Sequence, residues 1–102
     1  MSVLAVFWSD KAKKTYLDIL ENLNARWTAK ETNHFISRTE SVINKITENP
    51  LLFQQFKNDP LIRQAVLHAT VILIYKISPD GNTIHLLTFW PTRRDPKKIR
   101  FK

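Results

Sequence analysis

The stretch "VILIYKISPDGNTIHLLTFW", residues 71–90, decides the fold of this 102-residue chain because it reads as two strands joined by a tight turn. Val71 to Ile77 and Thr83 to Trp90 are rich in the β-branched and aromatic side chains that favour strands. Pro79-Asp80-Gly81-Asn82 lies between them and holds residue types that form hairpin turns. We therefore expect these two strands to pair antiparallel.

The amino-terminal part of the chain predicts a strand followed by an amphipathic helix. Val3 to Trp8 is apolar at nearly every position, as expected for a strand that is covered on both faces. Ser9 can cap the helix that follows. Apolar side chains recur in this helix at three- and four-residue steps, which predicts one buried face. They are Ala12, Tyr16, Ile19, Leu20, Leu23 and Trp27.

A second helix is expected to begin directly after the first. Thr28-Ala29-Lys30-Glu31 has the spacing of a capping box, and Asn49-Pro50 ends the helical pattern. The two helices should therefore form a hairpin. The apolar side chains of the second helix are Phe35, Ile36, Val42, Ile43 and Ile46.

The segment from Leu51 to Pro60 is expected to be a packed loop, and Ile62 to Leu67 is expected to be the strand that precedes the hairpin. The resulting order is β-α-α-β-β-β. The helices need an apolar surface to cover, so we predict an α+β fold in which a helical hairpin packs on a small antiparallel sheet. The length of the chain suits a single domain spanning residues 1–102.

Composition excludes several kinds of chemistry. The chain has no cysteine, so disulfides, thiolate metal sites and a cysteine nucleophile are ruled out. The first residues lack the basic start of a signal peptide, and their apolar run is too short to cross a membrane. We expect a cytoplasmic protein that binds neither metal nor membrane. A formal net charge of +7 favours an acidic partner, such as nucleic acid or an acidic protein.

Catalytic motifs are largely missing. Gly81 is the only glycine, which excludes a glycine-rich phosphate loop. His34, His68 and His85 are isolated in sequence, and such histidines are more often surface or hydrogen-bonded residues than catalytic ones. His68 and His85 lie at or within strands. They are weak catalytic candidates, able to carry a proton only if the fold brings them to an open face.

The carboxyl terminus concentrates positive charge in "TFWPTRRDPKKIRFK", residues 88–102. Asp95 is its only acidic residue, so the tail carries five of the seven net charges. Such a run can be a solvated terminus, or a docked segment whose arginines bind phosphate or carboxylate groups. If the second and fourth predicted strands flank the third, Arg63 should lie two strand spacings, or ~10 Å, from Arg93 and Arg94. The candidate target-binding residues are Arg63, Arg93, Arg94, Lys97, Lys98 and Arg100.

The whole pattern resembles the RelE/ParE superfamily of toxins from bacterial type II toxin–antitoxin modules. The resemblance covers about residues 3 to 101, and its most distinctive part is the final strand with its arginine and lysine run. It is carried by four segments, "FWSDKAKKTYLDIL", "ENPLLFQQF", "IRQAVLHATVILIYKI" and "IHLLTFWPTRRDPKKIRF".

The RelE branch implies a metal-free, ribosome-dependent messenger ribonuclease. Its pattern has a Lys-x-Lys pair on the second strand, an arginine on the third, another after the fourth, and a tyrosine six residues later. Matched strand to strand, the lysine pair falls on Arg63 and Ala65, and the third-strand arginine falls on Ile72. The last arginine falls on the Arg93–Arg94 pair, and residues 99–101 contain no tyrosine. Cleavage would then need His68 or His85 as a substitute.

The ParE branch implies the same scaffold without the catalytic set, poisoning DNA gyrase through protein contacts. The departures from the RelE pattern favour this branch. The alternatives are a RelE-like ribonuclease, a toxin with another target, an inactive relative or a plain nucleic-acid-binding module. The resemblance also implies a cognate antitoxin that wraps the toxin with an acidic, amphipathic segment. A homodimer or a toxin–antitoxin hetero-oligomer is compatible with it, and no cofactor is expected.

Overall fold

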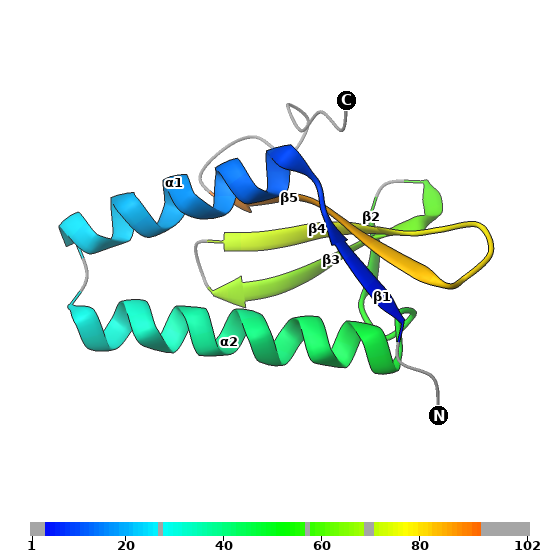
Figure 1. The fold of residues 1–102 in the computed structure, drawn as a ribbon, viewed down its shortest axis with the longest axis horizontal. Helices are drawn as coiled ribbons and strands as arrows, with labels where there is room; N and C mark the ends of the chain where they lie inside the picture. The colour runs from blue at the N-terminus through cyan, green and yellow to red at the C-terminus, as the bar shows by residue number, and fades with distance from the viewer. Residues whose placement is uncertain (1–3, 27, 57, 69–70, 93–102) are drawn as a thin grey trace.

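The computed structural model describes residues 4–26, 28–56, 58–68 and 71–92. Within them, two helices lie on one face of a five-stranded sheet whose strand order is β1-β5-β4-β3-β2. The α+β architecture that the sequence predicts is confirmed (Figure 1). The elements are β1 (Ala5–Trp8), α1 (Asp10–Arg26), α2 (Ala29–Glu48), β2 (Gln54–Phe56), β3 (Asp59–His68), β4 (Val71–Ile77) and β5 (Thr83–Pro91).

The hairpin of β4 and β5 forms as expected. The two strands pair antiparallel from Ile77 opposite Ile84 to Val71 opposite Pro91. Gly81 adopts a φ of 76° in the turn, a left-handed conformation that other residues rarely take. The backbone N–H of Gly81 donates to the carbonyl of Ser78 over 2.8 Å, which closes the turn.

The first strand pairs in a direction that the sequence pattern did not reveal. Strand β1 runs parallel to β5, with Ala5 opposite Thr83 and Trp8 opposite Leu86, so the sheet is mixed rather than wholly antiparallel. Parallel neighbours need a long crossover connection, and the helical hairpin together with the other strands supplies it. Because β1 is an edge strand, Phe7 is 58% exposed, and the prediction that this strand is covered on both faces was wrong.

The segment expected to be a loop contains a short strand. Gln54 and Gln55 in β2 pair with Gln64 and Arg63 of β3, which itself begins at Asp59 rather than at Ile62. The prediction of a loop throughout Leu51 to Pro60 was therefore wrong at β2. Two consecutive glutamines show no alternation of apolar and polar residues, so the pairing partner decides this strand rather than its own pattern.

The helices begin and pack as the sequence predicts. Thr28 accepts a hydrogen bond from the backbone N–H of Glu31, whose side chain accepts one from the backbone of Thr28, so the capping box is present. Leu23 and Trp27 lie outside the residues whose side chains are described. No helix in the described ranges is long and apolar enough to cross a bilayer. Buried core residues shared by the helices and the sheet include Ala12, Ile19, Phe35, Val42, Ile46, Ala65, Leu73, Tyr75, Leu86 and Phe89.

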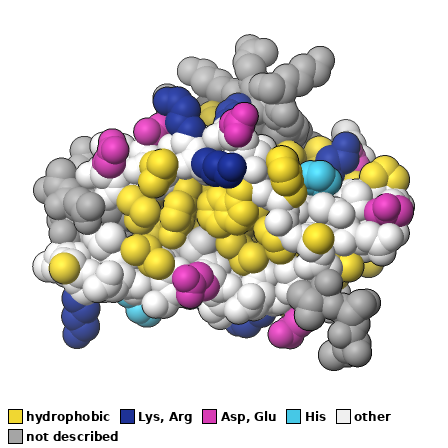
Figure 2. All heavy atoms as spheres, viewed as in Figure 1, with side chains coloured by type: hydrophobic (Ala, Val, Ile, Leu, Met, Phe, Trp, Pro, Cys, Tyr) yellow, Lys and Arg dark blue, Asp and Glu magenta, His cyan; other side chains and the backbone are white. Residues whose placement is uncertain are grey.

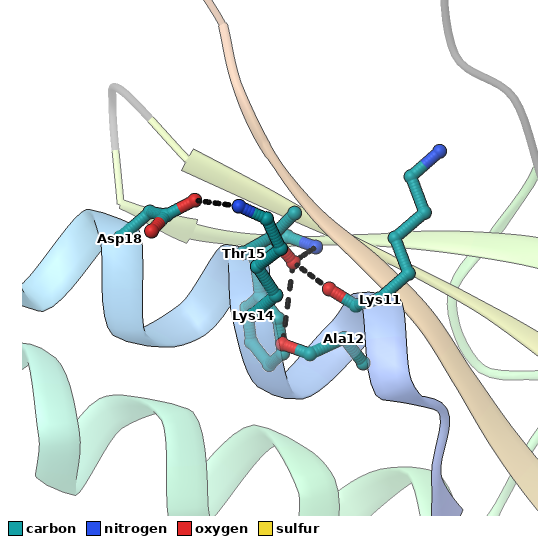
Figure 3. A network of polar contacts seen from close by, with 6 residues as sticks. Lys11, Ala12, Lys14, Thr15 and Asp18 are labelled. Atoms are coloured by element: carbon teal, nitrogen blue, oxygen red, sulfur yellow. Dashed lines mark hydrogen bonds and ion pairs between the residues drawn. The ribbon is translucent and has the colours of Figure 1, made fainter.

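Polar contacts join α1 to β5 where β1 ends. The backbone N–H of Ser9 donates to the carbonyl of Leu86, and its hydroxyl donates to the carbonyl of Leu87. Beyond that point, the backbone N–H of Phe89 donates to Oγ1 of Thr15 over 3.0 Å. The Thr15 hydroxyl also lies 2.8 Å from the carbonyl of Lys11 in its own helix (Figure 3). Thr15 thus replaces the strand partner that Phe89 lacks on this side.

Replacing Thr15 by valine should lower the free energy of unfolding by about 1–2 kcal/mol, because the isosteric side chain leaves the Phe89 N–H without its acceptor. Thr15→Ser keeps the hydroxyl and serves as the matched control, so it should cost clearly less. Urea unfolding of the three proteins measures the difference. A valine variant as stable as the parent, with a loss only for serine, would show that the methyl group, rather than the hydrogen bond, stabilises this contact.

Candidate interaction surface on the sheet

The face of the sheet that the helices do not cover is mostly apolar. Alternation along the strands places Leu73 and Leu86 toward the helices and Ile72 on the opposite face. A second cluster of apolar side chains lies on this open face, separate from the main core. Its buried members are Phe56, Ile74 and Trp90, and its half-buried members are Ile62, Ile72 and Leu87.

The two histidines proposed as proton carriers are far apart on the sheet. His85 pairs with Lys76 in β4, and its ring contacts the ring of Phe7 edge-on with centroids 5.7 Å apart. His68 is the last residue of β3 and pairs with Val71. Lys76 and Val71 are five residues apart along β4, which separates the two sites by roughly 16 Å. They cannot act as the acid and base of one reaction.

His68 also lines a surface hollow of about 460 Å³ beside the start of α2, together with Lys30, Glu31 and His34. Glu31 is already engaged in the capping box, and the described residues contain no group of three or more His, Cys, Asp or Glu that could hold a metal ion. Asn33 and Ser37 complete the lining of the hollow.

Arg63 is occupied by structural contacts. Its Nε donates to the carbonyl of Pro60 over 3.0 Å, and its Nη1 donates to the carbonyl of Phe53 over 3.1 Å. In the register Arg63 is level with Tyr75, whereas Pro91 at the end of β5 is level with Val71 and His68. Arg63 is therefore offset along the sheet from Pro91, and its expected approach to Arg93 and Arg94 concerns residues outside the described ranges.

Tyr75, which lies opposite Arg63 in the pairing register, also makes structural contacts. The residue is fully buried. Its hydroxyl donates to the carbonyl of Pro50 over 2.8 Å, and Phe53 contacts its ring edge-on. Burial raises the pKa of Tyr75 from 10.0 to about 12, while the charge of Arg63 lowers it. This tyrosine anchors the segment after α2 and is not poised to transfer a proton near neutral pH.

Two of the positions that carry cations in the RelE pattern, those of Ala65 and Ile72, are apolar in this fold, whereas Arg63 keeps a cation at a third. Ala65 is completely buried on the helix side of β3, and Ile72 lies on the open face between Val66 and Trp90 in the pairing register. The tail cations Arg93, Arg94, Lys97, Lys98 and Arg100 lie outside the described residues. The strand that precedes them ends at Pro91, level with His68.

Residues 6–96 match the model of the family described as the ParE toxin of the type II toxin–antitoxin system parDE. The chain belongs to the ParE toxin family. The match spans β1 to β5 and extends into the basic tail, so the ParE assignment covers the helices, the sheet and the first tail arginines together. The sequence matches no curated protein.

Solved structures show the same fold at low sequence identity. A chain of the chromosomal ParDE system of P. aeruginosa superposes with a TM-score of 0.70 and 11% identity, covering 87% of this ParE chain and 96% of that one. A YoeB/ParE toxin from Agrobacterium tumefaciens gives a TM-score of 0.62 and 12% identity over 86% and 98% of the two chains. A chain of the RelBE2 toxin–antitoxin complex of Mycobacterium tuberculosis gives 0.59 and 14% over 88% and 99%.

Stability of the ParE chain should fall as pH rises from 10 toward 12, because the unfolded state releases the Tyr75 proton first. Tyr75→Phe should be less stable at pH 8 by about 1 kcal/mol, since it loses the hydrogen bond to Pro50, and should show a shallower decline above pH 10. Tyr16 has a raised pKa as well, but it is present in both proteins and its effect cancels. Urea midpoints at several pH values measure both slopes, and parallel slopes would contradict the assignment.

Proposed function

We propose that this ParE-family toxin inhibits DNA gyrase by binding to it and carries out no chemistry of its own. The observation that carries the proposal is the loss of the cations that ribonuclease chemistry requires on the sheet. Cleavage of messenger RNA needs a base for the 2′-hydroxyl, cations for the developing phosphate charge, and an acid for the leaving oxygen. Ala65 is buried and Ile72 is apolar at two of the positions concerned.

The remaining polar residues do not replace that set. The guanidinium of Arg63 donates to two backbone carbonyls. His68 in β3 and His85 in β5 pair with residues near opposite ends of β4, so neither can complete a catalytic pair with the other. A binder needs only a stable scaffold and a complementary surface.

The basic tail is the part of the chain that we assign to the target. It carries five of the seven net charges and directly follows β5. Arginine presents a planar fork that binds carboxylate or phosphate groups through two hydrogen bonds, which lysine cannot do. Arg93 and Arg94 are therefore the leading contacts, supported by Lys97, Lys98 and Arg100.

A cognate antitoxin is the second proposed partner. The P. aeruginosa structure is of a ParDE system and the M. tuberculosis structure is of a toxin–antitoxin complex. A free domain with a net charge of +7 suits an acidic antitoxin segment. We place the resulting complex in the cytoplasm, where gyrase acts on DNA.

The decisive experiment compares two reactions with the same purified protein. Supercoiling of relaxed plasmid by gyrase should be inhibited, while codon-specific cuts in messenger RNA on translating ribosomes should stay at background. Robust cleavage that disappears on replacing His68 or His85 would instead support a RelE-like ribonuclease. Inactivity in both assays would support an inactive relative.

Tail variants belong to the same experiment. Arg93→Ala combined with Arg94→Ala should remove most inhibition, because a charge-assisted hydrogen bond contributes about 1.5–3 kcal/mol. Lysine at both positions should restore only part of it, since the charge returns without the fork. Melting temperatures should change little. A double alanine variant that inhibits as well as the parent would show that the tail is a solvated terminus.

A further inference from the structure

A polar hollow lies where the start of α2 passes the end of β3. Its volume is about 460 Å³, which is enough for a small ligand. Figure 1 shows that α2 begins, and β3 and β5 end, at the same end of the molecule. We call this site the α2–β3 hollow. Its described lining consists of Lys30, Glu31, Asn33, His34 and Ser37 of α2 and His68 of β3.

The α2 side of the hollow is one polar face of the helix. Residues 30, 33, 34 and 37 are three and four positions apart, which makes them neighbours on a helix surface. Phe35 and Thr39 are buried, so this face points away from the core. Figure 2 shows hydrophobic side chains gathered between α1 and α2, whereas the lining of the hollow is polar. The two are therefore separate surfaces.

The β3 side of the hollow is an uncovered stretch of the sheet edge. Within the described residues, β2 pairs with β3 no further along than Gln64. His68 comes four residues later, so no strand of the described chain lies beside it on that side. This arrangement leaves the half-exposed side chain of His68 next to the first turns of α2.

The lining is rich in hydrogen-bond donors. An ammonium, two imidazole rings, an amide and a hydroxyl can all donate. Glu31 brings a carboxylate, but this group already accepts hydrogen bonds from the backbone N–H and the hydroxyl of Thr28. A phosphate group offers only acceptor oxygens and negative charge, and lysine binds it as a point charge. The chemistry of the hollow therefore complements a phosphate group.

These donors are side chains rather than the free end of the helix. The backbone N–H of Glu31 donates to Oγ1 of Thr28, and that of Thr32 donates to the Thr28 carbonyl. Lys30 lies in the first turn, where the helix dipole disfavours a cation. The stability of the helix therefore gives no reason for a lysine at this position, whereas an anion in the hollow does.

A divalent metal is the competing ligand for two histidines. The ammonium of Lys30 repels a cation, and the carboxylate of Glu31 is engaged in the capping box. The parts of the chain that the structure describes contain no group of three or more His, Cys, Asp or Glu that could hold a metal ion. These residues favour an anion over a metal.

The hollow lies at the end of the sheet from which the chain continues into the basic tail. His68 is opposite Val71, and Val71 is opposite Pro91, so His68 and Pro91 lie two strand spacings, or roughly 10 Å, apart. Arg93 and Arg94 follow Pro91 directly in sequence after Thr92. A nucleic-acid strand carries a phosphate at every nucleotide, so a strand held in the hollow has further phosphates to offer to this end of the chain.

We propose that the α2–β3 hollow binds a phosphate group, supplied by a mononucleotide or by a nucleic-acid strand. Lys30 and His34 contact the phosphate from α2, and His68 contacts it from β3. This inference goes beyond the proposed inhibition of gyrase, and neither depends on the other.

Imidazole ¹H–¹⁵N spectra of the full-length chain test the proposal, because each of the three histidines reports on its own position. Titration with inorganic phosphate at constant pH and ionic strength should move the signals of His34 and His68 saturably, whereas sodium chloride should not. His85 is the internal control. It pairs with Lys76, roughly 16 Å along β4 from the partner of His68, so its signal should stay in place.

A matched pair of variants tests the role of the lysine. Lys30→Gln should bind phosphate at least about tenfold more weakly, because a charge-assisted hydrogen bond is lost. Its melting temperature should not fall, since the replaced cation opposes the helix dipole. Lys45→Gln removes an exposed lysine from the last turn of the same helix and should bind phosphate like the parent.

Two further ligands identify the source of the phosphate. Adenosine monophosphate offers a phosphate monoester, and a short oligothymidylate offers the phosphodiesters of a strand. Tighter binding of the oligothymidylate, weakened by Arg93→Ala with Arg94→Ala, would assign the site to a nucleic-acid backbone. Tighter binding of adenosine monophosphate, unchanged by the tail substitutions, would assign it to a mononucleotide.

The proposal fails if phosphate moves no histidine signal saturably, or if it moves all three alike as a general salt effect. It also fails if Lys30→Gln binds phosphate as well as Lys45→Gln does. A saturable change with Zn²⁺ and none with phosphate would show that the hollow is a metal site instead. Gyrase inhibition is measured separately, and none of these outcomes decides it.

Discussion

The position of β5 between β1 and β4 is the constraint on which the rest of the structure depends. Its antiparallel pairing with β4 builds the hairpin, and its parallel pairing with β1 requires the helices to cross the face of the sheet. Ser9 and Thr15 continue the contacts of β5 after β1 ends, which fixes the start of α1. Burial of Tyr16 against Phe89 then aligns this helix over the core. The same strand delivers the basic tail at its far end.

This arrangement divides the molecule into surfaces with different chemistry. One face of the sheet is covered by the helices, while the other carries the apolar cluster around Ile74 and Trp90. Polar groups that could have formed a reaction centre are instead used to hold loops, as Arg63 and Tyr75 show. A scaffold of this kind supports recognition by several partners. The function proposed for this ParE-family toxin is accordingly binding to a target rather than catalysis.

Local chemistry allowed much of this fold to be predicted from sequence. The turn at Gly81 and the capping box at Thr28 are set by neighbouring residues, and both form as expected. The direction of β1, the strand at Gln54 and the contacts of Arg63 were missed, because each depends on pairing between distant segments. Of the candidate site residues, Arg63 is held by backbone carbonyls, and the histidines prove too far apart for a shared reaction. The family resemblance was predicted from the segments that alternate strand and helix, and the ParE model confirms it.

The account depends most directly on which macromolecule the toxin binds. The test offers equal amounts of purified gyrase and 70S ribosomes together to the immobilised full-length chain without antitoxin. The measurement is which of the two is retained. We predict that gyrase is retained and that ribosomes pass through, at an ionic strength near 0.15 M where exposed long-range attraction is screened. Retention of ribosomes with gyrase in the unbound fraction would contradict the account.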